Sequence, residues 1–267
     1  MRQIHIAVVA LCAAAIACGG NDGNTSSNAA ASKIFTFSTP ITASAGEKSA
    51  VQAPLGRAAA IGGSSGAAFA LASFSSMTSG LLGSTGAAFS RSEVPAPGLK
   101  EGSSRRVEFN PNCISVSGNT YTYKNCQITF AGAGFSGTET FDGTISLSSD
   151  HRTVNWDLTV RLDLSGEGGS EKLQVHQSGT VTMGSNRISG DLRVEVSVSS
   201  TTGSTAAFAF DEDVTFDLTY QSTPFCVTSG SVEVKRVWTR QPGQAQPDKA
   251  VKLVWTGCNQ ATIAKSI

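Results

Sequence analysis

This 267-residue chain has only three histidines and few groupings of the residue types that catalysis usually requires. Serine, aspartate and histidine occur together in Ser148 to His151, but neighbours in one tight turn cannot adopt the geometry of a catalytic triad. His176 follows Val175 on a predicted strand, which directs the imidazole to the polar side of a sheet. The sequence therefore predicts no catalytic residues and no enzymatic activity.

The acidic run Asp211-Glu212-Asp213 is a further candidate for chemistry, as a weak calcium site. Adjacent residues on a strand point to opposite faces, so three consecutive carboxylates do not form a cage around a cation. The simpler interpretation is a solvated strand end. The cysteines show no C-x-x-C spacing and no histidine at ligand spacing, so the sequence predicts no metal site and no cofactor.

The first cysteines lie in an N-terminal segment that has the features of an export signal. Met1-Arg2 precedes an apolar run, Ile4 to Ala17, that is too short to span a bilayer. The run ends Ala15-Ile16-Ala17-Cys18, and a cysteine directly after a small residue resembles the bacterial lipobox. That resemblance implies a signal peptide of residues 1–17 and acylation of Cys18 by palmitate-type chains, which anchor a protein in a membrane. The alternative is an ordinary secretory signal with an incidental Cys18.

Gly19 follows this cysteine, whereas the inner-membrane retention signal of the lipobox family is an aspartate, so the resemblance implies the outer membrane. Removal of Arg2 with the signal lowers Lys plus Arg from 20 to 19 against 20 Asp plus Glu, a net charge of −1. Without a basic excess, the sequence predicts no nucleic-acid partner. The expected partners are the membrane and either a hydrophobic ligand or another envelope protein.

The four remaining cysteines are Cys113, Cys126, Cys226 and Cys258. An even number in an exported chain is typical of disulfides, with three pairings open. The first two cysteines are centred between Asn119 and Thr120, and the last two on position 242 within Pro242-Gly243. Each pair thus brackets a predicted hairpin, and we expect the disulfides Cys113–Cys126 and Cys226–Cys258.

The stretch from Thr153 to Leu164 indicates the kind of element that positions these residues. Its six apolar side chains alternate with polar ones without a break, which predicts a strand buried on one face and solvated on the other. Similar runs joined by short turns follow one another over residues 105–267, so neighbouring strands must be antiparallel. The expected strands are Ser115–Phe130 as a hairpin, Gly137–Ser148, Thr153–Leu164, Glu171–Met183, Arg187–Ser199, Ala206–Tyr220, Gly230–Arg240 and Lys249–Thr256.

The fold class that follows is all-β, a long-stranded antiparallel meander forming a strongly curved sheet or an open barrel. The alternation slips before Trp238, so we expect a β-bulge near Lys235-Arg236. The three tryptophans are expected in the core.

The residues before the β domain are distinguished by composition. Residues 18–54 are predicted to form a flexible tether, because residues 19–32 are almost entirely Gly, Asn, Ser, Ala and Thr. Residues 55–104 form an Ala/Gly/Ser-rich segment followed by a Pro/Gly linker. We expect one helix, about Ser65 to Leu82, on the apolar face of the sheet; the alternative is a collapsed linker. The apolar stripe of this helix consists of Ala70, Phe74, Met77 and Leu81.

The two cysteine-bounded units resemble each other, since Asn125-Cys126-Gln127-Ile128-Thr129 is similar to the stretch from Gly257 to Ile263. From about Asn112 onward the chain resembles uncharacterised bacterial envelope lipoproteins in which a cysteine-bounded hairpin precedes long alternating strands. This resemblance implies no known activity. We expect a membrane-anchored lipoprotein with a non-catalytic β module in a structural or binding role. The alternative is a periplasmic or outer-membrane carrier of a hydrophobic ligand such as a lipid, held on the apolar face.

Overall fold

The computed structural model describes residues 28–72, 74–82, 108–109, 111–132, 135–166, 169–200, 207–241 and 245–267. The predicted signal peptide, Cys18, the first part of the predicted tether and the predicted Pro/Gly linker lie outside these residues.

Within the described residues, four α-helices accompany a single sheet of twelve strands. The helices are α2 (Ala29–Ser32), α3 (Ala45–Ile61), α4 (Gly63–Ala72) and α5 (Phe74–Leu82), and one 3-10 turn spans Pro111–Cys113. The short strands are β1 (Ile41–Thr42), β2 (Glu108–Phe109), β3 (Ile114–Ser117) and β12 (Gln260–Lys265). The long strands are β4 (Thr120–Gly132), β5 (Phe135–Leu147), β6 (Thr153–Gly166), β7 (Gly169–Met183), β8 (Arg187–Ser200), β9 (Phe208–Ser222), β10 (Phe225–Arg240) and β11 (Lys249–Gly257).

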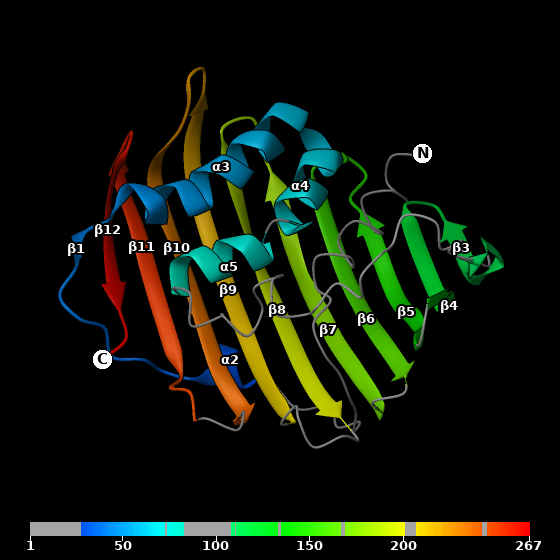
Figure 1. Ribbon diagram of the computed structural model, residues 1–267. Helices are drawn as coiled ribbons and strands as arrows, with labels where there is room; N and C mark the ends of the chain where they lie inside the picture. The colour runs from blue at the N-terminus through cyan, green and yellow to red at the C-terminus, as the bar shows by residue number, and fades with distance from the viewer. Residues whose placement is uncertain are drawn as a thin grey trace.

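Strands β4 to β12 follow one another as an antiparallel meander, and all the long strands expected from the alternation are present (Figure 1). The strand order is β1-β12-β11-β10-β9-β8-β7-β6-β5-β4-β2, with β3 also paired to β4. Among the described strands the sheet stays open, with β1 at one edge and β2 and β3 at the other. The predicted all-β meander is therefore confirmed as a curved open sheet.

The alternation in β6 sets the two faces of the sheet. Trp156 and Val160 are 3% and 8% exposed, whereas Asp157 is exposed on the opposite side. Val160 pairs with Val175 of β7, which pairs with Val196 of β8, so apolar side chains continue from strand to strand. We call this side the apolar face and the opposite side the polar face.

Helices α3, α4 and α5 cover one end of the apolar face (Figure 1). A capping box begins α3: the Glu47 amide donates to Ser44 Oγ (3.2 Å) and the Ser44 amide donates to the Glu47 carboxylate (2.8 Å). Gly62, with φ of +70°, ends the helix. The buried helical side chains share one core with the sheet; they are Val51, Leu55, Ala58, Ala67, Ala70, Met77, Leu81 and Leu82.

Two predictions for this region are wrong in detail. The single helix expected over Ser65–Leu82 is divided into α4 and α5, and α3 precedes both. The tether predicted over residues 18–54 is contradicted from Asn28 onward, because α2, β1 and the first part of α3 lie within residues 29–54 and the segment between α2 and β1 is hydrogen-bonded to the β12 edge. Ser44-x-x-Glu47 is the sequence signature of a capping box. The start of α3 could therefore have been predicted from the spacing of these two residues, although not from the composition of the segment.

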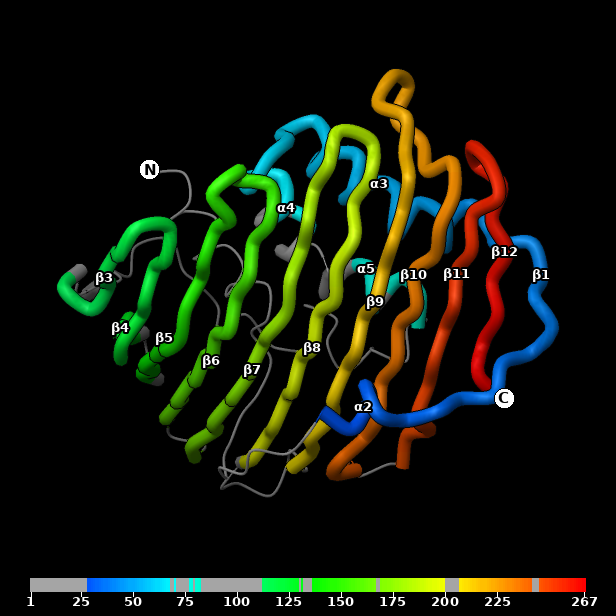
Figure 2. Tube along the Cα trace, turned by 180° about the vertical axis from the view of Figure 1, so that it is seen from behind, coloured from blue at the N-terminus to red at the C-terminus, as the bar shows by residue number. Residues whose placement is uncertain are grey.

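The chain before α3 crosses the polar face. Figure 2 shows α2 against β9 and β10, on the side opposite α3 to α5. Asn28 Nδ2 donates to the Glu212 carbonyl (3.2 Å), and the Ala29 amide donates to the Asp211 carboxylate (2.6 Å). The chain then reaches the β12 edge, where the Ser38 amide donates to the carbonyl of Lys265 (2.9 Å). These bonds fix the described chain to the sheet from its first residue.

The C-terminal edge also differs from the prediction. The strand expected over Lys249–Thr256 is β11, but it is not the last strand, because β12 and then β1 lie beyond it. Only Ala261 and Ile263 mark the apolar side of this six-residue strand, so its alternation is too short to be distinctive.

Candidate binding surfaces

Both predicted disulfides are present. The Cα atoms of Cys113 and Cys126 are 5.1 Å apart, and those of Cys226 and Cys258 are 5.5 Å apart. The first bond joins the end of the 3-10 turn before β3 to β4, and the second joins β10 to the turn between β11 and β12. The second disulfide therefore holds the connection to β12, whereas the sequence placed it at the end of the last strand.

The serine, aspartate and histidine of the 148–151 turn serve the turn itself. Ser148 Oγ donates to the Asp150 carboxylate and accepts from the Thr153 amide (2.9 Å). The hydrogen bond from Ser148 lowers the pKa of Asp150, and the bond from the Arg152 amide adds to the effect. His151 is exposed and has φ of +54°. The arrangement stabilises a reverse turn between β5 and β6.

His176 lies on the polar face, as its position in the alternation predicts. Its Nε2 is 2.8 Å from Asp157 Oδ1, and its Nδ1 is 3.6 Å from Glu195 Oε2. Glu195 is the direct cross-strand partner of His176. The imidazole thus lies between two carboxylates on the polar face.

The acidic run at residues 211–213 is not a solvated strand end. All three residues lie inside β9 and are only 4–6% exposed. Asp211 and Asp213 occupy the polar face, where burial raises the pKa of each carboxyl. Asp213 lies between Arg193 (3.8 Å) and Lys235, which oppose that rise. Glu212 points to the apolar face, so the three carboxylates do not converge.

A buried ion pair on the apolar face is the feature that the sequence analysis missed. Arg236 of β10 lies directly opposite Glu212 of β9, and its Nε donates to Glu212 Oε1 (2.6 Å). The Arg236 and Glu212 side chains are 10% and 7% exposed. The guanidinium also lies 4.9 Å from the centre of the Phe210 ring.

The β-bulge predicted near Lys235-Arg236 is absent from the described strands, and this ion pair explains why the prediction was wrong. No irregularity occurs at Lys235-Arg236 in the described β9–β10 pairing; the register shifts fall at Val227/Ser229 and Trp238/Arg240. Arg236 keeps its place in the alternation and simply faces inward. The sequence does contain a sign of the ion pair, because Glu212 and Arg236 carry opposite charges at inward positions of consecutive strands.

Two apolar clusters lie beyond the helices on the apolar face, where β6 ends and β7 begins, and where β8 ends and β9 begins. The buried residues are Leu162, Leu173 and Val175 in one cluster and Val198, Phe208 and Phe210 in the other. Trp238 packs edge-on against both phenylalanine rings of the second cluster. The described helices contribute no residue to either cluster. The expected core positions of Trp156 and Trp255 are confirmed at 3% and 2% exposure.

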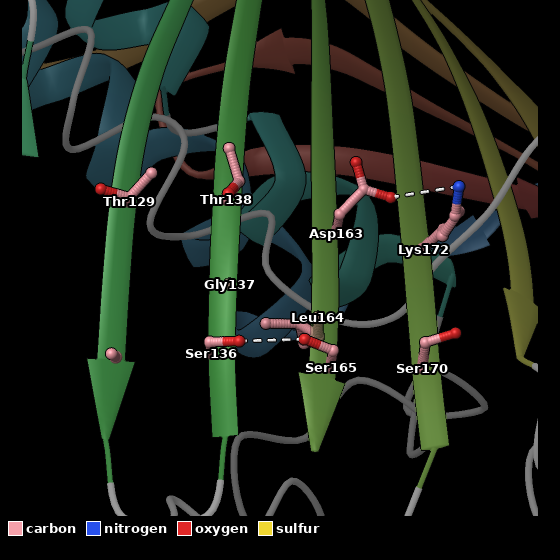
Figure 3. A pocket seen from close by; sticks show the side chains of 10 residues that line it. Thr129, Ser136, Gly137, Thr138, Asp163, Leu164, Ser165, Ser170 and Lys172 are labelled. Carbon is pink, nitrogen blue, oxygen red and sulfur yellow. Dashed lines mark hydrogen bonds and ion pairs between the residues drawn. The ribbon is translucent and has the colours of Figure 1, made fainter.

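A hydroxyl-rich hollow of about 520 Å³ lies on the polar face, near one end of β4 to β7 (Figure 3). Two cross-strand rows line it: Thr129, Thr138, Asp163 and Lys172 in one, and Ala131, Ser136, Ser165 and Ser170 in the other. Ser136 Oγ and Ser165 Oγ are 2.9 Å apart, and Lys172 Nζ is 3.6 Å from Asp163 Oδ1. The hollow offers exposed hydrogen-bonding groups to a polar ligand.

Comparison of the chain with family models, with curated proteins and with solved structures finds no match. In the part of the chain that the structure describes, no helix has both the length and the apolar character needed to cross a membrane. No group of three or more His, Cys, Asp or Glu in that same part is arranged to hold a metal ion.

Proposed function

We propose that this protein is a lipid-anchored envelope protein, attached through Cys18 to the outer membrane, whose β module has a non-catalytic structural or binding role. The observation that carries the proposal is the short distance along the chain between the anchor and the sheet. Asn28, only ten residues after Cys18, is already bonded to β9. Ten residues span at most about 36 Å, so a module anchored at Cys18 stays at the membrane surface.

The two disulfides support an extracytoplasmic location, because such bonds persist in oxidising compartments. The candidate catalytic residues already have hydrogen-bond or ion-pair partners within the fold, which supports a role without catalysis. Ser148 and Asp150 bind amides of their own turn, and His176 lies between two carboxylates on an open face of the sheet.

The anchor is tested by the mass of the mature N-terminal peptide. We expect acylated Cys18 at the N-terminus, loss of membrane attachment in Cys18→Ala, and accumulation of the precursor when lipoprotein signal peptidase is inhibited. Gly19→Asp should retain the protein in the inner membrane, whereas the matched variant Gly19→Ser should not. A mature N-terminus at any other residue contradicts the proposal.

The two apolar clusters beyond the helices favour a second candidate function, carriage of a hydrophobic ligand such as a lipid. Helices α3 to α5 fill the opposite end of the apolar face with protein side chains, which leaves the clusters as the place for a ligand. Because the buried residues of the clusters are only 1–9% exposed, the structure would have to open there for a ligand to bind. Protein purified without denaturant should then carry a stoichiometric lipid, detected by native mass spectrometry. Protein that carries no lipid and takes up no fatty acid would exclude carriage and leave the anchored module.

A further inference from the structure

One corner of the molecule exposes the two large apolar side chains with the greatest exposure among the described residues. Ile34 is 94% exposed and Ile267 is 85% exposed. Both line one open hollow of about 690 Å³, and the Ile267 amide donates to the Thr36 carbonyl (3.1 Å). The corner lies where the segment after α2 meets the start of β11 and the end of β12. Exposed apolar side chains gathered at one place are typical of an interaction surface.

Lysines accompany the two isoleucines. Lys33, Lys249 and Lys265 line the same hollow, together with Asp248. Lys33 pairs with Asp248, and Lys265 pairs with Glu47 (2.9 Å). Lysine has a long apolar stem and a charged end, so it can cover apolar surface while its ammonium reaches phosphates. Apolar side chains with lysines around them suit the boundary between lipid headgroups and acyl chains.

The chain connects this corner closely to the proposed anchor. Cys18 lies at most about 36 Å from Asn28 along a fully extended chain, and Ile34 at most about 21 Å further. The bonds from Asn28 and Ala29 to β9 fix where this connection joins the sheet. A membrane that holds Cys18 is therefore within reach of the corner.

We propose that this corner, formed by Ile34, Ile267, Lys33, Lys249 and Lys265, rests on the surface of the membrane that holds the lipid anchor. This inference rests on the proposed function, since the anchor brings the membrane to the corner. The acyl chains supply attachment, and the corner fixes how the sheet is oriented on the bilayer. Each isoleucine that enters the boundary favours the docked orientation by about tenfold.

Photo-crosslinking from single positions tests the orientation. A photoreactive amino acid replaces Ile34 or Ile267 in the full chain, and the purified protein is placed in vesicles of phosphatidylethanolamine and phosphatidylglycerol. Ile61 in α3 and Val116 in β3 are the matched control positions, because they are also apolar and are 51% and 58% exposed. Mass spectrometry then measures lipid adducts at each position.

We expect lipid adducts from Ile34 and Ile267 at about ten times the yield from the controls, and loss of the Ile267 adduct when Ile34→Ser and Lys33→Ser are combined. Equal yields at all four positions would overturn the proposal, and so would adducts to protein in place of lipid. The N-terminal mass of the same sample reports separately on the anchor. Where Cys18 is not acylated, the same comparison with added vesicles still decides whether the corner binds lipid.

Discussion

The buried pair of Arg236 and Glu212 gives the sharpest test of the structure. Glu212→Gln keeps the shape of the side chain but removes the charge that neutralises the guanidinium. Both side chains are at most 10% exposed, and their neighbours on the apolar face are Phe210, Val194 and Trp238. Removing one partner of a buried ion pair costs about 3–5 kcal/mol, because the remaining charge stays desolvated. We expect that loss in the free energy of unfolding.

A second ion pair in the same sheet provides a matched control. Arg187 binds Asp217 through two hydrogen bonds of 2.7 and 2.6 Å, but these side chains are 61% and 55% exposed on the polar face. Exposed pairs contribute at most about 1 kcal/mol, so Asp217→Asn should have a small effect. The contrast isolates burial, since both pairs join arginine to a carboxylate across neighbouring strands.

Urea unfolding followed by far-ultraviolet circular dichroism, with the disulfides intact, measures both variants. The double variant Glu212→Leu with Arg236→Met replaces the pair with apolar side chains of similar size, and it should recover most of the lost stability. A loss below about 1 kcal/mol for Glu212→Gln, or equal losses for Glu212→Gln and Asp217→Asn, would show that the first pair is not buried.

Three further predictions concern the core, the disulfides and pH. Trp156→Ala should cost about 3–5 kcal/mol in urea unfolding, and a cost near zero would contradict its buried position. Loss of Cys113–Cys126, which spans 13 residues, should cost about 3 kcal/mol, and loss of Cys226–Cys258, which spans 32, slightly more; mapping of non-reduced peptides checks both pairs. Burial raises the pKa of Glu139 above its usual 4.5, so its favourable contribution is present at low pH and is lost as pH rises through the folded pKa. Glu139→Gln should therefore be more stable than the parent protein at pH 7, and a gain that persists undiminished at pH 3 would contradict this account.

The long strands could be predicted because the alternation of apolar and polar residues within each strand shows which of its faces is buried. In β6 the six inward positions are apolar and the outward ones are polar, so one strand read alone gives its faces and, through the short turns, its neighbours. The disulfides followed from the same reasoning, since each pair is centred on a hairpin. Strand alternation and cysteine spacing can both be recognised within one stretch of sequence, without knowing which distant residues contact it.

The helices over the apolar face could not be predicted as well, because they contact one another through small side chains. Where α3 meets α4, a Cβ at Gly66 would overlap the carbonyl oxygen of Ala58, so glycine permits the close approach. A contact made by glycine and alanine leaves no strong apolar periodicity in the sequence. Composition therefore indicated a flexible tether where the structure has the first part of α3, and the predicted single helix over Ser65–Leu82 did not reveal the division into α4 and α5.

The acidic run in β9 shows where reasoning from one strand fails. Residues 211–213 appeared solvated because three charges in succession are costly to bury alone. In the sheet, neighbours reduce that cost: Arg236 neutralises Glu212 on the apolar face, Arg193 and Lys235 face Asp213 on the polar face, and the amide of Ala29 binds Asp211. These partners come from β8, β10 and the start of α2, so no single stretch of sequence contains the pattern. The acidic run therefore fixes the N-terminal segment to the sheet, and with it the point at which the proposed anchor joins the fold.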